Sequence, residues 1–148
     1  MVKEATLEEI DEIIILVKLY REFYGVDCQD ASEIENFIRE RLTNNQSKIF
    51  IALDDKKNGI GFIQLYPSYS TVSLKSQWVL NDLYVVEQHR RKGVATALMN
   101  AVKEYFTDKT KGFILVTDKD NYTAKSFYDK NGWKTNEYDF YTYYYCQK

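Results

Sequence analysis

The sequence predicts one α+β domain, 1–148, with a central mixed β-sheet flanked by about four helices. Three observations predict it. The length of 148 residues suits a single hydrophobic core. Apolar residues alternate along the chain between helical and strand periods. The elements follow in the order ααββ, then βαβα, then ββ, so a right-handed crossover should make the strands near 78–86 and 113–117 parallel.

Two helices are predicted at the start of the chain. Residues 6–9, TLEE, have the capping-box pattern, and apolar residues then repeat at helical spacing to about Phe23. Residues 32–35, SEIE, form a second capping-box pattern. It opens a shorter helix, for which Asn44 and Asn45 provide a stop.

The middle of the chain predicts strands and a third helix. Residues 48–53 and 59–66 are apolar runs around a polar turn, which is typical of an antiparallel hairpin. A Ser-rich loop follows, and 78–86 is a third, long strand. The buried face of the next helix is predicted from Val94, Ala97, Leu98, Ala101, Val102 and Tyr105.

The last third of the chain predicts three more elements. Residues 113–117 form a short apolar strand, and 121–130 form a helix with Gly132 just after its end. Residues 133–145 have the pattern of a terminal hairpin.

Charge and cysteine content exclude several classes of protein. With 22 acidic and 20 basic residues the net charge is -2, which gives no cationic field to hold nucleic acid. Cys28 and Cys146 are isolated, without the spacing of a metal or redox site, and fit a reducing cytoplasm. The first residues carry acidic side chains among apolar ones, so they predict neither a signal peptide nor a membrane span.

The segment 88–95, QHRRKGVA, links a strand end to a helix start and is a candidate phosphate cradle. Unpaired amides and the helix dipole favour an anion at such a place. Gly93 allows close backbone approach, and the basic run adds positive charge. The two common nucleotide-binding glycine patterns are absent. A solvated basic turn explains the loop alone equally well.

Two motifs, separated along the chain, favour the phosphate cradle over the solvated turn. The first is Leu83-Tyr84-Val85 followed by 90–95, RRKGVA; the second is Asn121, Ala124, Phe127-Tyr128 and Gly132-Trp133. Together they resemble the signature of the GNAT superfamily of N-acetyltransferases. The resemblance covers about 78–133. Glu87 stands where the family often has proline, and Ala95 where glycine is commoner.

The resemblance implies a sheet whose two parallel strands splay apart, with acetyl-CoA beside them and no metal. It implies that the pantetheine arm pairs with Leu83 and Val85, that the backbone of 90–96 holds the pyrophosphate, and that Asn121 reaches the arm. The implied cofactor-binding residues are Leu83, Tyr84, Val85, Arg90, Arg91, Lys92, Gly93, Val94, Ala95, Thr96, Asn121, Ala124, Phe127 and Tyr128.

Acyl transfer to an amine requires a neutral amine, a stabilised oxyanion and a proton for the departing thiolate. Tyr128 is the candidate general acid, since a tyrosine with an ordinary pKa of about 10 is protonated at neutral pH. Asp82, in the strand beside the expected thioester, is the candidate base. Glu87, His89 and the carboxylates of the first helix remain alternatives acting through water.

The acceptor pocket has four candidate residues. Tyr20 and Tyr24 share a helix face by i,i+4 spacing, and Gln64 and Tyr66 alternate on a strand that could form the opposite wall. Ordinary packing explains all four as well. The acceptor is expected to be a primary amine on a small molecule, such as a polyamine or an amino acid.

Alternative functions stay open at this stage. They are acetylation of protein N-termini or lysines, and noncatalytic sensing of acyl-CoA. The tyrosine-rich segment 138–145 predicts a homodimer contact, a pocket rim or a covering strand.

Overall fold

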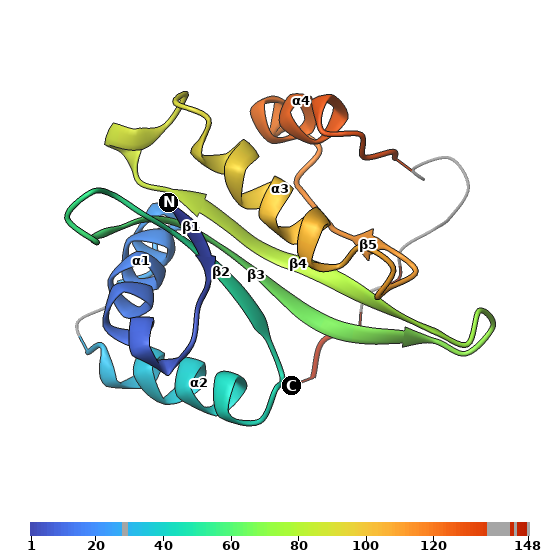
Figure 1. Cartoon of the computed structure of the whole chain (residues 1–148), viewed down its shortest axis with the longest axis horizontal. Coiled ribbons are helices and arrows are strands. Elements are labelled where there is room, and N and C mark those ends of the chain that lie inside the picture. Colours follow the sequence, from blue (N-terminus) through green and yellow to red (C-terminus); the bar gives the residue numbers. More distant parts are fainter. Residues whose placement is uncertain (28–29, 136–142, 144, 148) are drawn as a thin grey trace. The chain divides into compact units, whose positions relative to one another are not determined.

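The computed structural model describes residues 1–27, 30–135, 143 and 145–147 (Figure 1). The chain divides into two compact units, Met1–Val116 and Thr117–Lys148. The first unit holds the sheet and three of the α-helices. No helix in the described part of the chain combines the length and apolar character needed to cross a membrane.

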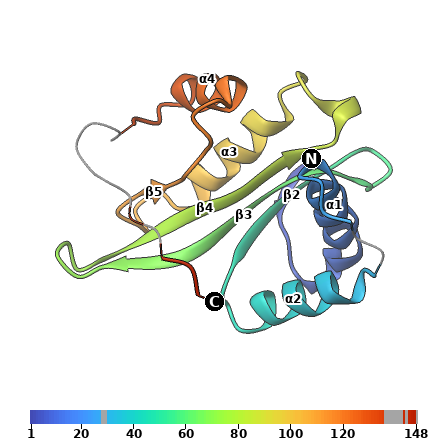
Figure 2. The same cartoon turned by 180° about the vertical axis from the view of Figure 1, so that it is seen from behind.

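A mixed sheet of five strands forms the centre of the first unit, as the sequence predicts. Its strands lie in chain order: β1 (Val2–Glu4), β2 (Lys48–Leu53), β3 (Gly59–Ser70), β4 (Lys75–Val85) and β5 (Phe113–Ile114). The neighbours from β1 to β4 pair antiparallel, and β4 pairs parallel with β5. Figure 2 shows this order from behind. The predicted parallel pair is therefore confirmed.

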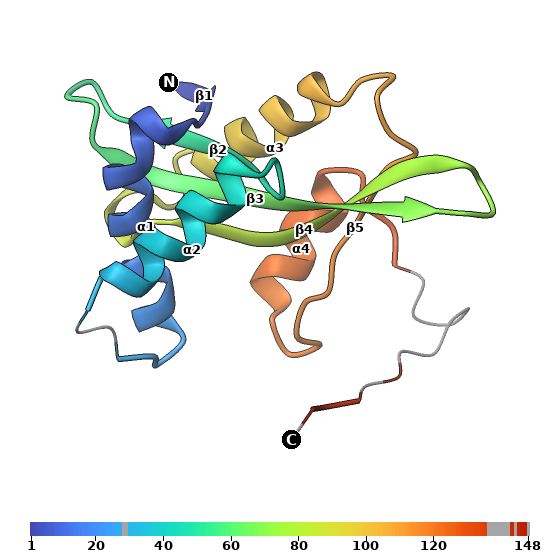
Figure 3. The same cartoon turned by 90° about the horizontal axis from the view of Figure 1, so that it is seen from below.

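Helices cover both faces of this sheet (Figure 3). A 3₁₀ turn, Leu7–Glu9, leads into α1 (Ile10–Phe23), and α2 (Ser32–Thr43) follows. Both pack on one face, where they share a hydrophobic core with alternate residues of β2 and with Phe62. On the other face lies α3 (Val94–Tyr105), whose Tyr105 ring is 5.6 Å from that of Phe50 in β2.

Local signals for the first helix are confirmed. The Thr6 hydroxyl accepts from the Glu8 amide at 3.2 Å, and the Glu9 carboxylate accepts from the Thr6 amide at 2.8 Å. This is the predicted capping box. On α3 the buried residues are Leu98, Met99 and Val102, so the predicted stripe holds at its centre. The stripe is wrong at Ala97, which is exposed.

Two further predictions are wrong. No side chain caps α2 at Ser32, because Ala31 is the cap residue and the Ser32 amide instead donates to the Asp30 carboxylate at 2.8 Å. The Ser-rich segment is largely strand, since β3 continues to Ser70 and β4 begins at Lys75. Continuous antiparallel pairing from Leu65 to Ser70 overrides the weak strand propensity of serine.

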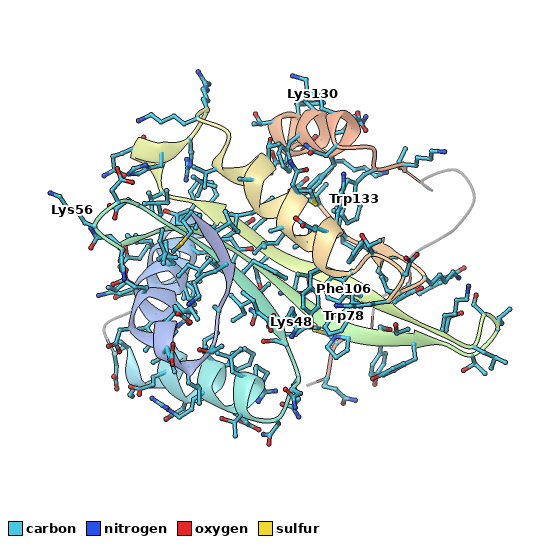
Figure 4. The ribbon with its side chains drawn as sticks, in the orientation of Figure 1. Lys48, Lys56, Trp78, Phe106, Lys130 and Trp133 are labelled. Carbon is cyan, nitrogen blue, oxygen red and sulfur yellow. The ribbon has the colours of Figure 1, made fainter. Side chains whose placement is uncertain are left out.

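Aromatic side chains pack together where β4 and β5 pair, next to the end of α3. Trp78 of β4 lies 4.8 Å from Phe106 between ring centroids, and both are labelled in Figure 4. Phe113 of β5 contacts the same Phe106 ring at 5.4 Å. These contacts hold β5 against the first part of β4.

The second unit contains α4 (Tyr122–Lys130). Asn121 caps it, since its side-chain oxygen accepts from the Ala124 amide at 3.1 Å. Gly132 follows the helix end with φ 85°, as its position in the sequence predicts. The predicted terminal hairpin, 133–145, and the tyrosine-rich 138–145 fall mostly outside the described residues.

Candidate active site

A β-bulge in β4 determines how the candidate base is presented. Gln64 pairs with Asp82 and Leu65 pairs with Leu80, so Asn81 is an extra residue on β4. A bulge of this kind bends the strand and redirects the side chains beside it. It places Asp82 directly opposite Gln64 on the face that α1 and α2 cover.

Gln64 and Asp82 are joined by a hydrogen bond. Gln64 Nε2 donates to Asp82 Oδ2 at 2.9 Å, and Asn81 Nδ2 donates to the same oxygen at 3.0 Å. Gln64 is 3% exposed, and no described residue donates to its buried Oε1. A buried acceptor without a donor is costly, so this atom suits a ligand N–H or a water.

Two tyrosines surround the Asp82 carboxylate. Burial raises the pKa of Tyr20, and the negative charge of Asp82 raises it further. Burial and Asp82 together raise the pKa of Tyr66 to about 12, although Arg41 and Gln64 act in the opposite direction. Both hydroxyls therefore stay protonated at neutral pH and can donate hydrogen bonds.

These groups line a cavity of about 400 Å³ between α1, α2 and the sheet. Its polar lining includes two carboxylates, Glu33 and Asp82, and one guanidinium, Arg21. The full lining is Val17, Tyr20, Arg21, Glu33, Ile34, Phe37, Ile38, Phe62, Gln64, Tyr66, Asn81 and Asp82. A concave apolar site with a few converging polar groups is the usual form of a small-molecule site.

The structure brings together most of the predicted acceptor residues. Tyr20, Gln64 and Tyr66 line this cavity with Asp82. Tyr24 does not line it. Its side chain is 65% exposed, and its ring meets Tyr20 edge-on at 5.1 Å. Tyr24 therefore packs against Tyr20 and is not part of the cavity lining.

Sequence reasoning missed several residues of the cavity. Asn81 and Glu33 do not belong to any motif that predicts a binding or catalytic site. Phe37 lies at the edge of the apolar stripe of α2, whose buried residues are Ile34 and Ile38, and it is 49% exposed and lines the cavity wall. The signal that could have found it is its place at the edge of that stripe, where an aromatic side chain is only half covered.

Beyond its first residues, β4 has a free edge. Its parallel pairing with β5 is limited to Trp78 with Phe113 and Val79 with Ile114. From Leu80 to Val85 no described strand pairs with that side of β4. Leu83 and Val85, predicted to bind the pantetheine arm, lie in this stretch. An extended ligand could take the place of a strand there.

The predicted phosphate cradle folds as a turn that ends at the first residue of α3. A short 3₁₀ helix, Glu87–His89, follows β4, and Gly93 is the N-cap of α3 with φ 82°. A Cβ built on Gly93 meets nothing within 4 Å, so space lies open in front of it. The amides of Val94, Ala95 and Thr96 begin the helix and have no acceptor within it.

Arg90 differs from its two neighbours in the basic run. Its Nε donates to the Val85 carbonyl at 2.9 Å, and its guanidinium lies over the rings of Phe23 and Tyr84 at 5.3 and 5.6 Å. It therefore fixes the turn after β4. Arg91, with φ 61°, and Lys92 are exposed beside the helix start.

The remaining predicted residues lie in the second unit. Asn121 is the cap of α4, and Ala124 supplies the amide that it accepts from. Phe127 and Tyr128 lie 5.5 Å apart between ring centroids, and Tyr128 lies 5.7 Å from Trp133. The motif residues thus form one local cluster on α4 and just after it.

Comparison with known proteins agrees with this geometry. A model of the acetyltransferase (GNAT) family matches residues 13–133. The uncharacterised N-acetyltransferase YhfO of Bacillus subtilis is 39% identical over 136 residues, which are 90% of this chain and 89% of the relative. A crystal structure of a probable acetyltransferase has a TM-score of 0.90 at 35% identity, over 100% of this chain and 99% of the other.

A more distant structure shows the shared fold alone. The ribosomal-protein-alanine N-acetyltransferase of Brucella melitensis biovar Abortus has a TM-score of 0.79 at 16% identity, over 100% of this chain and 99% of its own. The family match extends over most of the chain and across both units. On this evidence the chain belongs to the acetyltransferase (GNAT) family and is an N-acetyltransferase.

Proposed function

We propose that this enzyme transfers the acetyl group of acetyl-CoA to a primary amine of a small molecule, by direct attack in a ternary complex. The observation that carries the proposal is the Asp82 carboxylate, held by Gln64 within a cavity walled by Tyr20 and Tyr66. Family membership establishes the acetyl transfer, and this cavity supports the choice of acceptor.

The residues present suit acetyl-CoA, which supplies the acetyl group as a thioester. The free edge of β4 at Leu83 and Val85 offers backbone groups to an extended amide-bearing arm. The open space at Gly93 and the first amides of α3 suit a pyrophosphate, with Arg91 and Lys92 adding positive charge. The cradle therefore fits an anion of this kind.

The cavity suits an amine acceptor. An ammonium group is attracted by the Asp82 and Glu33 carboxylates, and its N–H can donate to the buried Gln64 Oε1. This would satisfy Gln64 Oε1, to which no residue in the described part of the chain donates. Tyr20 and Tyr66 then limit the space around the amine.

Asp82 can remove the proton that keeps the amine unreactive. Its carboxylate accepts a proton from the ammonium group, directly or through one water, and leaves a neutral nucleophile. Tyr128 would supply a proton to the sulfur as the carbon–sulfur bond breaks, and the proton that the new amide nitrogen releases would restore the Tyr128 hydroxyl. This role rests on the family motif in which Tyr128 stands.

A small-molecule acceptor agrees with the cavity, since about 400 Å³ is in the range of small-molecule sites. Acetylation of protein N-termini or lysines is the alternative enzyme, and noncatalytic acyl-CoA sensing is the alternative outside catalysis. A cytoplasmic location and a homodimer remain predictions of the sequence.

Two measurements on the full chain test the proposal. Acetyl-CoA at about 100 times its Kd should stabilise the fold by roughly 2.7 kcal/mol, seen as a raised thermal midpoint. Free CoA thiol should then appear on adding a primary amine. Stabilisation with no thiol release from any amine would support the sensor. Acetyl label entering only peptides would favour the protein acetyltransferase.

A further inference from the structure

A second cavity, of about 590 Å³, adjoins the first one. Phe37 and Tyr66 line both, so the two cavities share a wall along α2 and β3, and together they are called the groove here. The remaining lining of the second cavity is Arg41, Asn45, Gln46, Pro67 and Tyr69. Among these residues Arg41 is the single charged one, whereas the first cavity holds two carboxylates and one guanidinium, which leaves it with an excess of negative charge.

The groove therefore has opposite charge at its two ends. Asp82 lies at one end and Arg41 at the other, with Tyr66 between them. Both act on the Tyr66 hydroxyl, because Asp82 raises its pKa and Arg41 lowers it. The Tyr66 hydroxyl is thus close enough to both charges for each of them to affect its pKa.

Arg41 is held in place while one of its donors stays unused. Its guanidinium lies 4.7 Å from the centre of the Phe37 ring, one helical turn away on α2. Its Nη2 donates to the exposed Glu40 carboxylate at 2.8 Å. Its Nε is buried, and no described residue accepts from it. A buried guanidinium donor of this kind suits an anionic acceptor atom.

We propose that the acceptor is an amino acid-like molecule, with its amine at Asp82 and Gln64 and a carboxylate at Arg41. This inference rests on the proposed function and names the substrate class. Gln64 and Tyr66 are two residues apart on β3, a step of about 7 Å. A chain of four methylene groups between amine and carboxylate has about this length.

The geometry argues against a polyamine. A second ammonium group would lie against the Arg41 guanidinium, and the Glu40 carboxylate that pairs with Arg41 is exposed and lies outside the lining of that cavity. A simple alkylamine would leave the buried Nε of Arg41 without an acceptor.

The test compares three amines of matched length: 5-aminopentanoate, pentylamine and cadaverine. The readout is thiol release from acetyl-CoA by the full-length enzyme. We expect kcat/KM to be highest for 5-aminopentanoate. Arg41→Gln should lower that value about 10- to 100-fold, mainly through KM, and lower the value for pentylamine much less. Arg41→Glu should reverse the preference and favour cadaverine. Both variants should keep the thermal stabilisation by acetyl-CoA.

Arg39→Gln is the matched control, since Arg39 lies on the same helix, pairs with Glu35 and lines neither cavity. It should leave all three amines unaffected. If the three amines react equally well and Arg41→Gln changes nothing, this inference is overturned and the proposed function stands. If no amine releases thiol although acetyl-CoA stabilises the protein, the proposed function fails and the inference with it.

Discussion

Gln64 and Asp82 pair across β3 and β4 beside the bulge at Asn81, with a hydrogen bond of 2.9 Å between their side chains. The amide nitrogen of Gln64 is committed to the carboxylate, so its Oε1 is the group left for a ligand. The bulge at Asn81 thus places two groups in the same cavity: the hydrogen-bonded Asp82 carboxylate, and Gln64 Oε1, to which no described residue donates.

Asp82→Asn should lower kcat/KM for the amine about 100-fold at neutral pH, because an amide cannot accept the proton. The shape of the site is kept, since the new carbonyl oxygen can still accept from Gln64. Thiol release measures the rate, and Asp55→Asn, in the exposed turn after β2, is the control. Activity within twofold of the parent enzyme would show that another group is the base.

Tyr128→Phe should lower turnover by about 100-fold while acetyl-CoA still raises the thermal midpoint. The phenyl ring keeps the contacts with Phe127 and Trp133 but has no proton to give. Tyr122→Phe is the control on the same helix, because Tyr122 is 73% exposed. Equal losses in both variants would point to a structural effect on α4.

Gly93→Ala should weaken binding of acetyl-CoA and cost about 1 kcal/mol of folding stability. The stability cost arises because Gly93 has φ 82°, which a residue with a Cβ adopts reluctantly. The binding loss arises because the added methyl group enters the open space in front of the helix amides. Isothermal titration calorimetry measures the binding.

Gly25→Ala separates the two effects. Gly25 has φ 77° and nothing within 4 Å of a built Cβ, but it follows α1 and is not part of the turn that begins α3. We expect a similar stability loss with unchanged acetyl-CoA binding. Unchanged binding in Gly93→Ala as well would move the pyrophosphate site elsewhere.

Much of the fold could be predicted because its signals are local. The capping pattern at Thr6 and Glu9 lies within four residues, and the periodicity of α1 follows it directly. The same pattern at Ser32 was misleading, since Asp30 competes for the Ser32 amide. Serines near residue 70 were interpreted as loop because serine has a weak strand propensity, although they pair with the neighbouring residues 75–77.

In the candidate site, too, local features could be predicted and features that depend on strand pairing could not. Tyr20, Gln64 and Tyr66 were predicted to line one acceptor pocket, whereas the position of Asp82 opposite Gln64 in that cavity depends on the bulge at Asn81. A bulge is a property of register between two strands. Arg41 was not singled out at all, because its importance comes from a cavity shared between α2 and β3.

The last prediction concerns stability and pH. Burial alone would raise the pKa of Glu9, but hydrogen bonds from Lys3 and from Thr6 outweigh it and lower that pKa. A carboxyl group with a lowered folded pKa stabilises the fold above its unfolded value of about 4.3, and this contribution is lost as pH falls through the folded value. Glu9→Gln should therefore cost about 1 kcal/mol at pH 7.

The cost should shrink below about pH 4, because the parent protein then also carries a neutral side chain at position 9. Urea unfolding at a series of pH values measures it. Glu8→Gln is the control, since Glu8 lies in the same turn and is exposed. A cost for Glu9→Gln that is independent of pH would mean that the cap acts through shape alone, with no contribution from the charge.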